Sequence, residues 1–385
     1  MAVPNGSRRV MNTRRHCIVA GLSGQVGQGL LEAVAGFGEQ SAVVSAIVRR
    51  RRRSNLDSPN VVVDQHIGDV TLPFWGLDVD AEQSNDVDVV VNLAGIVDWT
   101  ASQAEMNRVN YLGAVNGLRL AEALSEKHGR TVPYVYASTT YVAGTSSGLI
   151  AESLHPADPD RSVYELSKWY AEQTLISEAR STGHPVLVAR IGGVIGSSIT
   201  DETVRKSSLY QLVASLRQAE WRYLPVRSGG RVDILPRNII GEGLLRLISV
   251  GAERNFEPWR GGRLVHLCAG DRAPTLEALF SVLKAMDCDQ VYSVPKLIAV
   301  NDGTLRLAEN IVLKYMRWDR EKGNRLFGLR YVSIDRIFET TNLTELTDGW
   351  YPEMSLDDIV RIIFGLGRAR KTTVPGTDYP FGRLL

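Results

Sequence analysis

Short apolar runs alternate with stretches of helical periodicity along the first half of the chain. Each run is almost wholly apolar, which is typical of strands buried on both faces of a parallel sheet. Between the first two runs, Leu30, Leu31, Val34 and Phe37 recur at helical spacing. The alternation predicts an α/β fold in which a doubly wound parallel sheet carries helices on both faces. The expected strands are residues 17–20, 42–48, 61–63, 87–92, 134–137 and 185–191, and the expected later helices are 107–128 and 164–179.

The clean alternation fades after residue 196. Residues 199–218 have helical spacing, residues 231–235 and 264–267 look like strands that return to the sheet, and the chain is largely helical from residue 273. We therefore expect a smaller, mostly helical C-terminal region built partly from insertions, rather than a second domain behind a clean linker.

The composition is that of an ordinary globular protein. Of 385 residues, 44% are hydrophobic and 23% are charged, which excludes collagen, coiled coils and general disorder. The net charge of +1 provides no overall field toward nucleic acid or anionic lipid, so neither is an expected partner. No apolar run is long enough for a spanning helix. We expect a cytoplasmic protein, and the sequence leaves the oligomeric state undecided, with a homodimer open.

Cysteine and histidine usage predicts no metal site. The three cysteines are widely spaced and form no CxxC pair, and the six histidines are scattered. Cys268 falls on an expected strand and is expected to be an inert core residue. His155 precedes Tyr164 in a loop rich in proline and aspartate, and a solvated loop position is the ordinary expectation for it.

Three glycines stand between the first expected strand and the helix that follows it. Their spacing is G-x-x-G-x-x-G. A side chain at these positions would keep the backbone away from a pyrophosphate, which binds at the helix N-terminus. In this strand–turn–helix context the spacing predicts a Rossmann-type dinucleotide site. The candidate cofactor contacts in the turn are Gly21, Ser23, Gly24, Gln25, Val26 and Gly27.

Five arginines, Arg49 to Arg53, follow the second expected strand. In dinucleotide-binding folds an acidic residue at this strand end holds the ribose 2′-hydroxyl of NAD, whereas arginine holds the 2′-phosphate of NADP. No Asp or Glu stands at the strand end. The sequence therefore predicts NADPH as the cofactor, with Arg49 and Arg50 as contacts and the rest of the run as surface.

Thr139, Tyr164 and Lys168 form the candidate catalytic set. Thr139 follows an expected strand, and Tyr164 and Lys168 are four positions apart on one expected helix, so they share a face. A nearby ammonium favours the tyrosinate, so Tyr164 is expected to exchange a proton near neutral pH. The Thr139 hydroxyl is expected to hold the substrate oxygen.

These residues together resemble an extended short-chain dehydrogenase/reductase over about residues 17–250. The resemblance implies that Asp69 and Val70 flank the adenine, that Leu93, Ala94 and Gly95 line the cofactor groove, and that Lys168 holds the nicotinamide ribose. It also implies that the segment after Arg190 faces the nicotinamide. The residues that carry the resemblance are the three glycines, Gly68-Asp69, Asn92 to Gly95, Asn110, Ser138-Thr139, Tyr164, Lys168 and Arg190 to Gly196, with Ile191, Gly192 and Val194 as cofactor contacts.

Several segments are most similar to the thioester reductase and fatty acyl-CoA reductase branch, the male-sterility-type NAD-binding proteins. They are Gly68 to Leu77, Ile96 to Trp99, Asn110 to Gly113, Ser138 to Val142, Arg231 to Pro236 and Phe338 to Asn342. Gln25 departs from the phenylalanine that is common there, and Ile191 from a common proline. The resemblance implies NADPH-dependent reduction of an acyl thioester, acyl-CoA or acyl carrier protein supplied in trans, to an aldehyde or an alcohol.

Other functions stay open. Within enzymes, the alternative is an epimerase, dehydratase or keto/hydroxy oxidoreductase that acts on a sugar nucleotide or another small alcohol. Outside enzymes, it is an NADP-sensing regulator without turnover, against which Tyr164 and Lys168 argue. Trp221, Tyr223 and Trp259 are candidate walls of an acyl pocket, although core packing is their more ordinary role.

The motifs divide the chain into an N-terminal segment, a cofactor domain and a substrate region. The expected bounds are a flexible segment 1–16, an NADP-binding domain 17–196 with returning segments 231–250 and 263–269, and a substrate-binding region 197–230 and 270–385.

Overall fold

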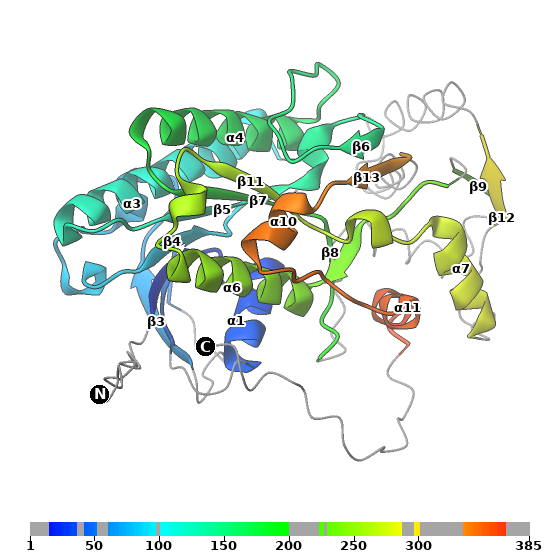
Figure 1. Cartoon of the computed structure of the whole chain (residues 1–385), viewed down its shortest axis with the longest axis horizontal. Coiled ribbons are helices and arrows are strands. Elements are labelled where there is room, and N and C mark those ends of the chain that lie inside the picture. The colour runs from blue at the N-terminus through cyan, green and yellow to red at the C-terminus, as the bar shows by residue number, and fades with distance from the viewer. Residues whose placement is uncertain are drawn as a thin grey trace, which may run out of the picture.

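All seven strands of the central sheet run parallel, in the order β11-β7-β5-β4-β1-β2-β3 (Figure 1). The computed structural model describes residues 15–36, 42–51, 61–97, 101–199, 223–226, 229–286, 296–300 and 334–366. The seven strands are β1 (His16–Ala20), β2 (Ala42–Val48), β3 (Val61–Ile67), β4 (Val89–Asn92), β5 (Tyr134–Thr139), β7 (Val186–Ile191) and β11 (Arg263–Leu267).

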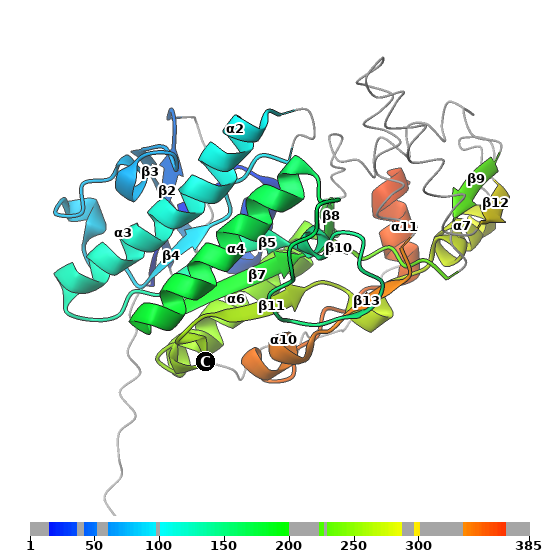
Figure 2. The ribbon, with the colours of Figure 1, turned by 90° about the horizontal axis from the view of Figure 1, so that it is seen from above.

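Helices cover both faces of this sheet, which confirms the predicted doubly wound fold (Figures 1 and 2). The helices α3 (Gly113–His128) and α4 (Val163–Thr182) lie on one face, and α1 (Gln25–Gly36) and α6 (Arg237–Glu253) lie on the other. Side chains alternate between two buried clusters, as the period of two in a strand requires. On β4, for example, Val89 and Val91 pack toward α1 and α6, whereas Val90 packs toward α3 and α4.

The helix α4 begins and ends at strong local signals. Ser162 and Glu165 form a capping box, in which each side chain bonds the backbone amide of the other. Gly183 ends the helix with φ +72°, a left-handed conformation that glycine adopts without steric cost. These two signals fix where the helix starts relative to Tyr164, which is its second residue.

Of the remaining elements, α7, α11, β9 and β12 lie together at one end of the molecule (Figure 2). Part of this region has its own apolar cluster, which joins α7 and α11 to Ile195 and Ile234. Besides the strands and helices given above, the described elements are α2 (Gln103–Met106), a π-helical segment (Asn107–Leu112), β6 (Gly148–Ile150), β8 (Gly193–Ile195), β9 (Tyr223–Val226), β10 (Ile234–Pro236), α7 (Leu276–Ala285), β12 (Lys296–Ala299), β13 (Arg336–Phe338), α10 (Thr341–Leu346) and α11 (Leu356–Phe364). Short 3₁₀ turns occur at 73–76, 82–84, 140–143, 257–259 and 270–272.

One expected strand does not join the main sheet. Of the expected strand 231–235, Ile234 and Leu235 lie in β10 (Ile234–Pro236), which pairs with β8 in a separate two-stranded sheet. The place beside β7 is taken by β11, so β10 pairs instead with the continuation of the chain after β7. Residues 264–267 do return to the sheet within β11. Most of the expected helix 199–218, and residues 1–14, lie outside the described residues.

Candidate active site

The glycine turn packs directly against the loop after β4. Gly21 has φ +85°, and a Cβ atom there would lie 2.5 Å from the amide nitrogen of Ala94. A Cβ atom on Gly27 would lie 2.5 Å from the Cα atom of Leu22. Both positions therefore require glycine, one for its backbone conformation and one for the close approach of α1 to the turn. The amino end of α1 opens at this turn, and its first amides have no partner within the helix.

The expected cofactor contacts on neighbouring strands lie along the same edge. Arg49 and Arg50 follow β2 and are exposed. The carboxylate of Asp69 accepts a bond from the amide of Thr71 (2.9 Å), and the carbonyl of Val70 accepts one from Asn116 Nδ2 (2.9 Å). Asp69 and Val70 are thus held in a fixed turn after β3, and the side chain of Asp69 stabilises that turn.

The loop after β4 is tied down by the last residue of that strand. Asn92 Oδ1 accepts a bond from the amide of Ala94 (3.0 Å), and Leu93 donates its amide to the carbonyl of Ala20 on β1 (2.8 Å). Gly95 faces the catalytic candidates, because a Cβ atom there would lie 3.2 Å from Lys168 Nζ. A side chain at position 95 would therefore crowd Lys168 and Asn110.

Across the sheet, the segment after β7 is half-buried and bonded on both sides. The amide of Gly192 donates to the carbonyl of Leu267 (3.2 Å), and Val194 lies in β8 opposite Leu235. Ile191, at the end of β7, is buried. The expected contacts from the glycine turn to Val194 therefore all follow the carboxyl ends of parallel strands, the edge at which ligands bind in such sheets.

The three catalytic candidates meet at the carboxyl end of β5. Thr139, Tyr164 and Lys168 are all at least 94% buried, with exposed fractions of 5%, 6% and 4%. The Thr139 and Tyr164 side chains are hydrogen-bonded to each other. Lys168 Nζ donates to the carbonyl of Ala137 (2.9 Å) and lies 4.6 Å from the centroid of the Tyr136 ring. The strand end and the helix face that the sequence pattern singled out therefore lie together in the structure.

Burial controls the protonation of this set. It raises the pKa of Tyr164, contrary to the expectation of a tyrosinate near neutral pH. The Thr139 hydrogen bond opposes this shift without cancelling it. Burial lowers the pKa of Lys168 to about 8, and the Glu172 carboxylate raises it in the opposite direction. At neutral pH Tyr164 is a protonated phenol, so it can donate a proton or a hydrogen bond to a developing oxyanion.

Asn110 lies at the site but was not part of the candidate catalytic set. It lies in the π-helical segment that precedes α3, and its Oδ1 atom accepts a bond from the amide of Ile96 (2.8 Å). Its Nδ2 atom donates to the hydroxyl of Ser167 on α4 (3.0 Å). Asn110 thus ties the loop after β4 to the catalytic helix. Apolar spacing predicts a helix here but does not distinguish π from α geometry, so the place of Asn110 could not be read from it.

Several further expectations have clear outcomes. Trp259 is fully buried beside Phe256 in the core under the sheet, so it packs the core and lines no acyl pocket. Tyr223 is half-exposed on β9, and Trp221 lies outside the described residues. His155 is not a solvated loop residue, because its ring is half-buried and its Nε2 atom lies 3.1 Å from Arg190. Cys268 is buried, as expected.

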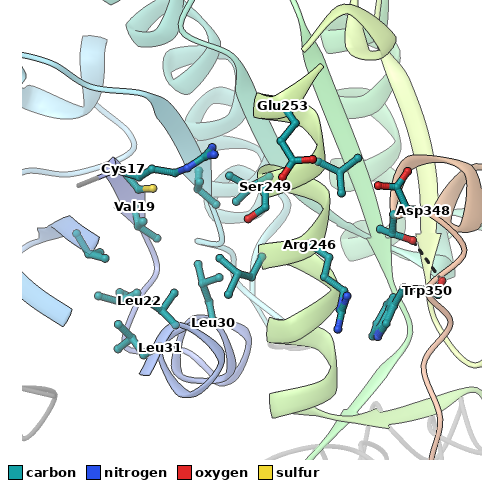
Figure 3. Close-up of a pocket in the computed structure, with 18 of the residues that line it drawn as sticks. Cys17, Val19, Leu22, Leu30, Leu31, Arg246, Ser249, Glu253, Asp348 and Trp350 are labelled. Atoms are coloured by element: carbon teal, nitrogen blue, oxygen red, sulfur yellow. Dashed lines mark hydrogen bonds between the residues drawn. The ribbon is translucent and has the colours of Figure 1, made fainter. Parts of the chain in front are cut away.

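An apolar cavity of about 360 Å³ lies on the α1/α6 side of the sheet (Figure 3). Val19 lines it from β1, Leu30 and Leu31 from α1, Arg246 and Glu253 from α6, and Trp350 from the segment after α10. None of the three catalytic candidates lines it. This cavity is therefore separate from the candidate active site.

Comparison with known families decides the class of this protein. A family model described as Male sterility protein, whose domain binds NAD, matches residues 46–242, more than half of the chain. The chain belongs to this family. The matched range includes every catalytic candidate and most of the expected cofactor contacts of this male sterility protein family member.

Individual relatives share less of the chain. A linear gramicidin synthase of Brevibacillus parabrevis is 26% identical over 190 residues, which are 47% of this chain and 4% of the synthase. The family member therefore spans a small fraction of that relative. The terminal R domain from the myxalamid PKS-NRPS biosynthetic pathway superposes with a TM-score of 0.68 (20% identity, 92% of this chain and 90% of that chain). A UDP-galactose 4-epimerase superposes with a TM-score of 0.59 (18% identity, 91% and 98%).

These structural likenesses show the fold alone, that of the extended short-chain dehydrogenases/reductases. Membership of the family makes the chain an NAD(P)-binding protein. The residues present fit such a cofactor. Gly21 and Gly27 let the turn pack closely against the loop after β4 and against α1, which leaves the amino end of α1 at the turn where a pyrophosphate binds in such folds. Lys168 and Tyr164 are buried at the same edge of the sheet.

The described ranges contain neither a spanning helix nor a metal cluster. No helix in them is long and apolar enough to cross a membrane. No group of three or more His, Cys, Asp and Glu side chains suited to a metal ion occurs in that part of the chain either.

Proposed function

We propose that this family member is an NADPH-dependent reductase of acyl thioesters. The observation that supports it is that Thr139 and Tyr164 are buried and hydrogen-bonded to each other, with buried Lys168 bonded to the carbonyl of Ala137 on the same strand, at the edge of the sheet that carries the glycine turn. The similarity of the sequence to a linear gramicidin synthase and of the fold to a terminal R domain favours a thioester over other carbonyl substrates.

The proposed roles follow from the positions of the side chains. When bound, the nicotinamide supplies a hydride for the thioester carbonyl carbon. The Thr139 and Tyr164 hydroxyls would stabilise the developing oxyanion, and the Lys168 ammonium would hold the ribose. The resulting hemithioacetal breaks its carbon–sulfur bond, releases the thiol with a proton and leaves an aldehyde. A second reduction of the aldehyde would give the alcohol.

The cofactor and substrate assignments are also part of this proposal. Arg49 and Arg50 are exposed at the end of β2, where an NADP 2′-phosphate would lie, and no carboxylate of the described residues follows β2 directly. A cavity of about 530 Å³ lies beside the β8–β10 pair, and its lining includes Leu235, Ile239 and Met354 but none of the three catalytic candidates. We propose that the region beyond β8 forms the substrate side, and that the acyl group arrives on coenzyme A or on a carrier protein in trans.

The experiment is a coupled measurement of cofactor and thiol. Purified protein is mixed with NADPH and acyl-CoAs of different chain length, or with an acyl carrier protein, and NADPH loss is followed beside free thiol release. We expect matched loss and release with NADPH and much weaker activity with NADH. Tyr164→Phe should lower kcat at least about 100-fold. Tyr170→Phe is the control, because Tyr170 is a half-exposed residue of the same helix.

Two results would contradict the proposal. NADPH loss without thiol release would exclude thioester reduction, and unchanged kcat in Tyr164→Phe would remove Tyr164 from the reaction. The second candidate function, sugar-nucleotide epimerisation or dehydration, is favoured by the structural likeness to UDP-galactose 4-epimerase. It predicts a tightly retained oxidised cofactor and turnover of a sugar nucleotide without net NADPH loss.

A further inference from the structure

A fully buried ion pair lies behind the catalytic candidates. Arg190, on β7, and Glu172, on α4, each have side chains with 0% exposure. Arg190 Nε lies 3.0 Å from Glu172 Oε1, and Arg190 Nη2 lies 2.7 Å from Glu172 Oε2. The pair is therefore bidentate, the geometry in which an arginine fixes a carboxylate in both position and orientation.

The Glu172 side of the pair reaches both elements that carry the catalytic candidates. Glu172 lies one helical turn after Lys168 and two turns after Tyr164 on α4. Its Oε1 atom accepts a hydrogen bond from the Ser138 hydroxyl (2.5 Å), and Ser138 directly precedes Thr139 on β5. The Glu172 carboxylate thus joins α4, which carries Tyr164 and Lys168, to β5, which carries Thr139.

The Arg190 side of the pair holds the loop that leads into α4. Arg190 Nη2 donates to the carbonyl of Ser153 (2.8 Å), and Nη1 lies 3.1 Å from His155 Nε2 and 3.3 Å from His266 Nε2. His266 Nδ1 lies 2.7 Å from the carbonyl of Glu339, so it carries the ring proton and leaves Nε2 as an acceptor for Arg190. Burial, with Arg190 as the next cause, lowers the pKa of both histidines to about 3. Each guanidinium nitrogen named here therefore has an acceptor.

A buried pair of this kind contributes little net stability, because desolvation of two charges offsets their attraction. Its physical effect is geometric: it permits one arrangement of the groups that it bonds. We propose that Glu172 and Arg190 are positioning residues of the catalytic set, which hold Thr139, Tyr164 and Lys168 in one reactive arrangement. The measurement of kcat that tests this inference rests on the proposed function.

The charge of Glu172 gives the proposal a distinctive consequence. Lys168 lies beside the Tyr136 ring and the Ala137 carbonyl of β5, and Tyr164 and Glu172 lie one turn before it and one turn after it on α4. Glu172 is the carboxylate among them, and it raises the Lys168 pKa against the effect of burial. A neutral residue at 172 should therefore lower the pH above which Lys168 loses its proton.

The experiment compares Glu172→Gln with Glu178→Gln in the full chain. Glu178 lies on the same helix but forms a partly exposed pair with Arg119. We measure thermal unfolding, kcat and KM at each pH, and the pH dependence of NADPH affinity.

In Glu172→Gln we expect kcat to fall about tenfold or more. The limb on which activity declines with rising pH should move to lower pH by about one unit. NADPH affinity below that limb should stay within about twofold. Glu178→Gln should match the parent protein.

The outcomes separate this inference from the proposed function. If Glu172→Gln folds and keeps both kcat and the pH limb, the inference is wrong. If it does not fold, Ser138→Ala decides: we expect a several-fold loss of kcat with unchanged NADPH affinity, and an unchanged kcat would overturn the proposal. If the parent protein reduces no acyl thioester, the proposed function fails, and the pH dependence of NADPH affinity decides alone. A shift in Glu172→Gln then supports positioning, and no shift refutes it.

Discussion

Gly21 has two requirements that only glycine meets. Its φ of +85° is unfavourable for other residues, and a Cβ atom would lie within 2.6 Å of the Leu93 carbonyl oxygen as well as of the Ala94 amide. A side chain here must therefore move either the turn or the loop after β4. Both contain expected cofactor contacts.

We predict that Gly21→Ala lowers the free energy of unfolding by about 2 kcal/mol or more and weakens NADPH binding at least about tenfold. Gly36→Ala is the control, because a Cβ atom there meets nothing within 4 Å. That variant should leave the unfolding free energy within about 0.5 kcal/mol and the affinity unchanged. Chemical denaturation and NADPH titration of both variants provide the measurement. Equal behaviour of the two would show that the turn tolerates a side chain.

The helices α2 and α4 begin with the same capping box, one built on Ser102 and one on Ser162. Each capping serine is expected to contribute about 1 kcal/mol to the free energy of unfolding, because the local hydrogen bonds are the same. Their neighbours differ, because Tyr164 is the second residue of α4.

We predict that Ser102→Ala and Ser162→Ala each lower the unfolding free energy by about 1 kcal/mol, but that only Ser162→Ala lowers kcat, by about three- to tenfold. The first turn of α4 then frays and takes the Tyr164 hydroxyl away from Thr139. Denaturation and steady-state kinetics on both variants test this. Loss of activity in both, or in neither, would show that the cap does not position Tyr164.

At this scale the sequence specified much of the fold. The strand 42–48 was predicted with its observed bounds, since its apolar run is sharply bordered, and the face shared by Tyr164 and Lys168 followed from helical spacing alone. The π-helical segment and the partner of β10 could not be predicted, because both depend on contacts between distant residues. The Glu172–Arg190 pair was missed for the same reason. Its two residues lie on a helix and on a strand, and the sequence pattern does not show that their side chains point toward each other.

At the scale of the whole molecule, the contacts of Arg190 with His155 and His266 join three separate elements: β7, the loop before α4, and β11. Glu152 extends this link, accepting bonds from the amides of His266 and Asn342. Burial raises the pKa of Glu152 to about 7 and lowers that of each histidine to about 3. Between about pH 5 and 6 the folded protein carries one proton on Glu152, whereas the unfolded chain carries two, one on each histidine. These groups therefore make stability rise with pH in that window.

We predict a slope of about 1.4 kcal/mol per pH unit from these three groups between about pH 5 and 6. His266→Asn, which can keep the donor toward Glu339, removes one of the two protons that the unfolded chain gains. The slope contributed by these groups should then fall close to zero. Denaturant unfolding at closely spaced pH values measures it, with His128→Asn, at the last residue of α3, as a control. An unchanged slope in His266→Asn would mean that His266 is charged in the folded protein.

The order of strands along the chain sets the order in which the two sides of the site become complete during synthesis. Six strands of the sheet, the glycine turn and all three catalytic candidates come from residues up to Ile191. The loop before α4 finds its partners much later, since β6 pairs with β13 and Glu152 with Asn342. On the ribosome, the glycine turn and the three catalytic candidates would therefore emerge well before β13 and Asn342, the partners of the loop that leads into α4.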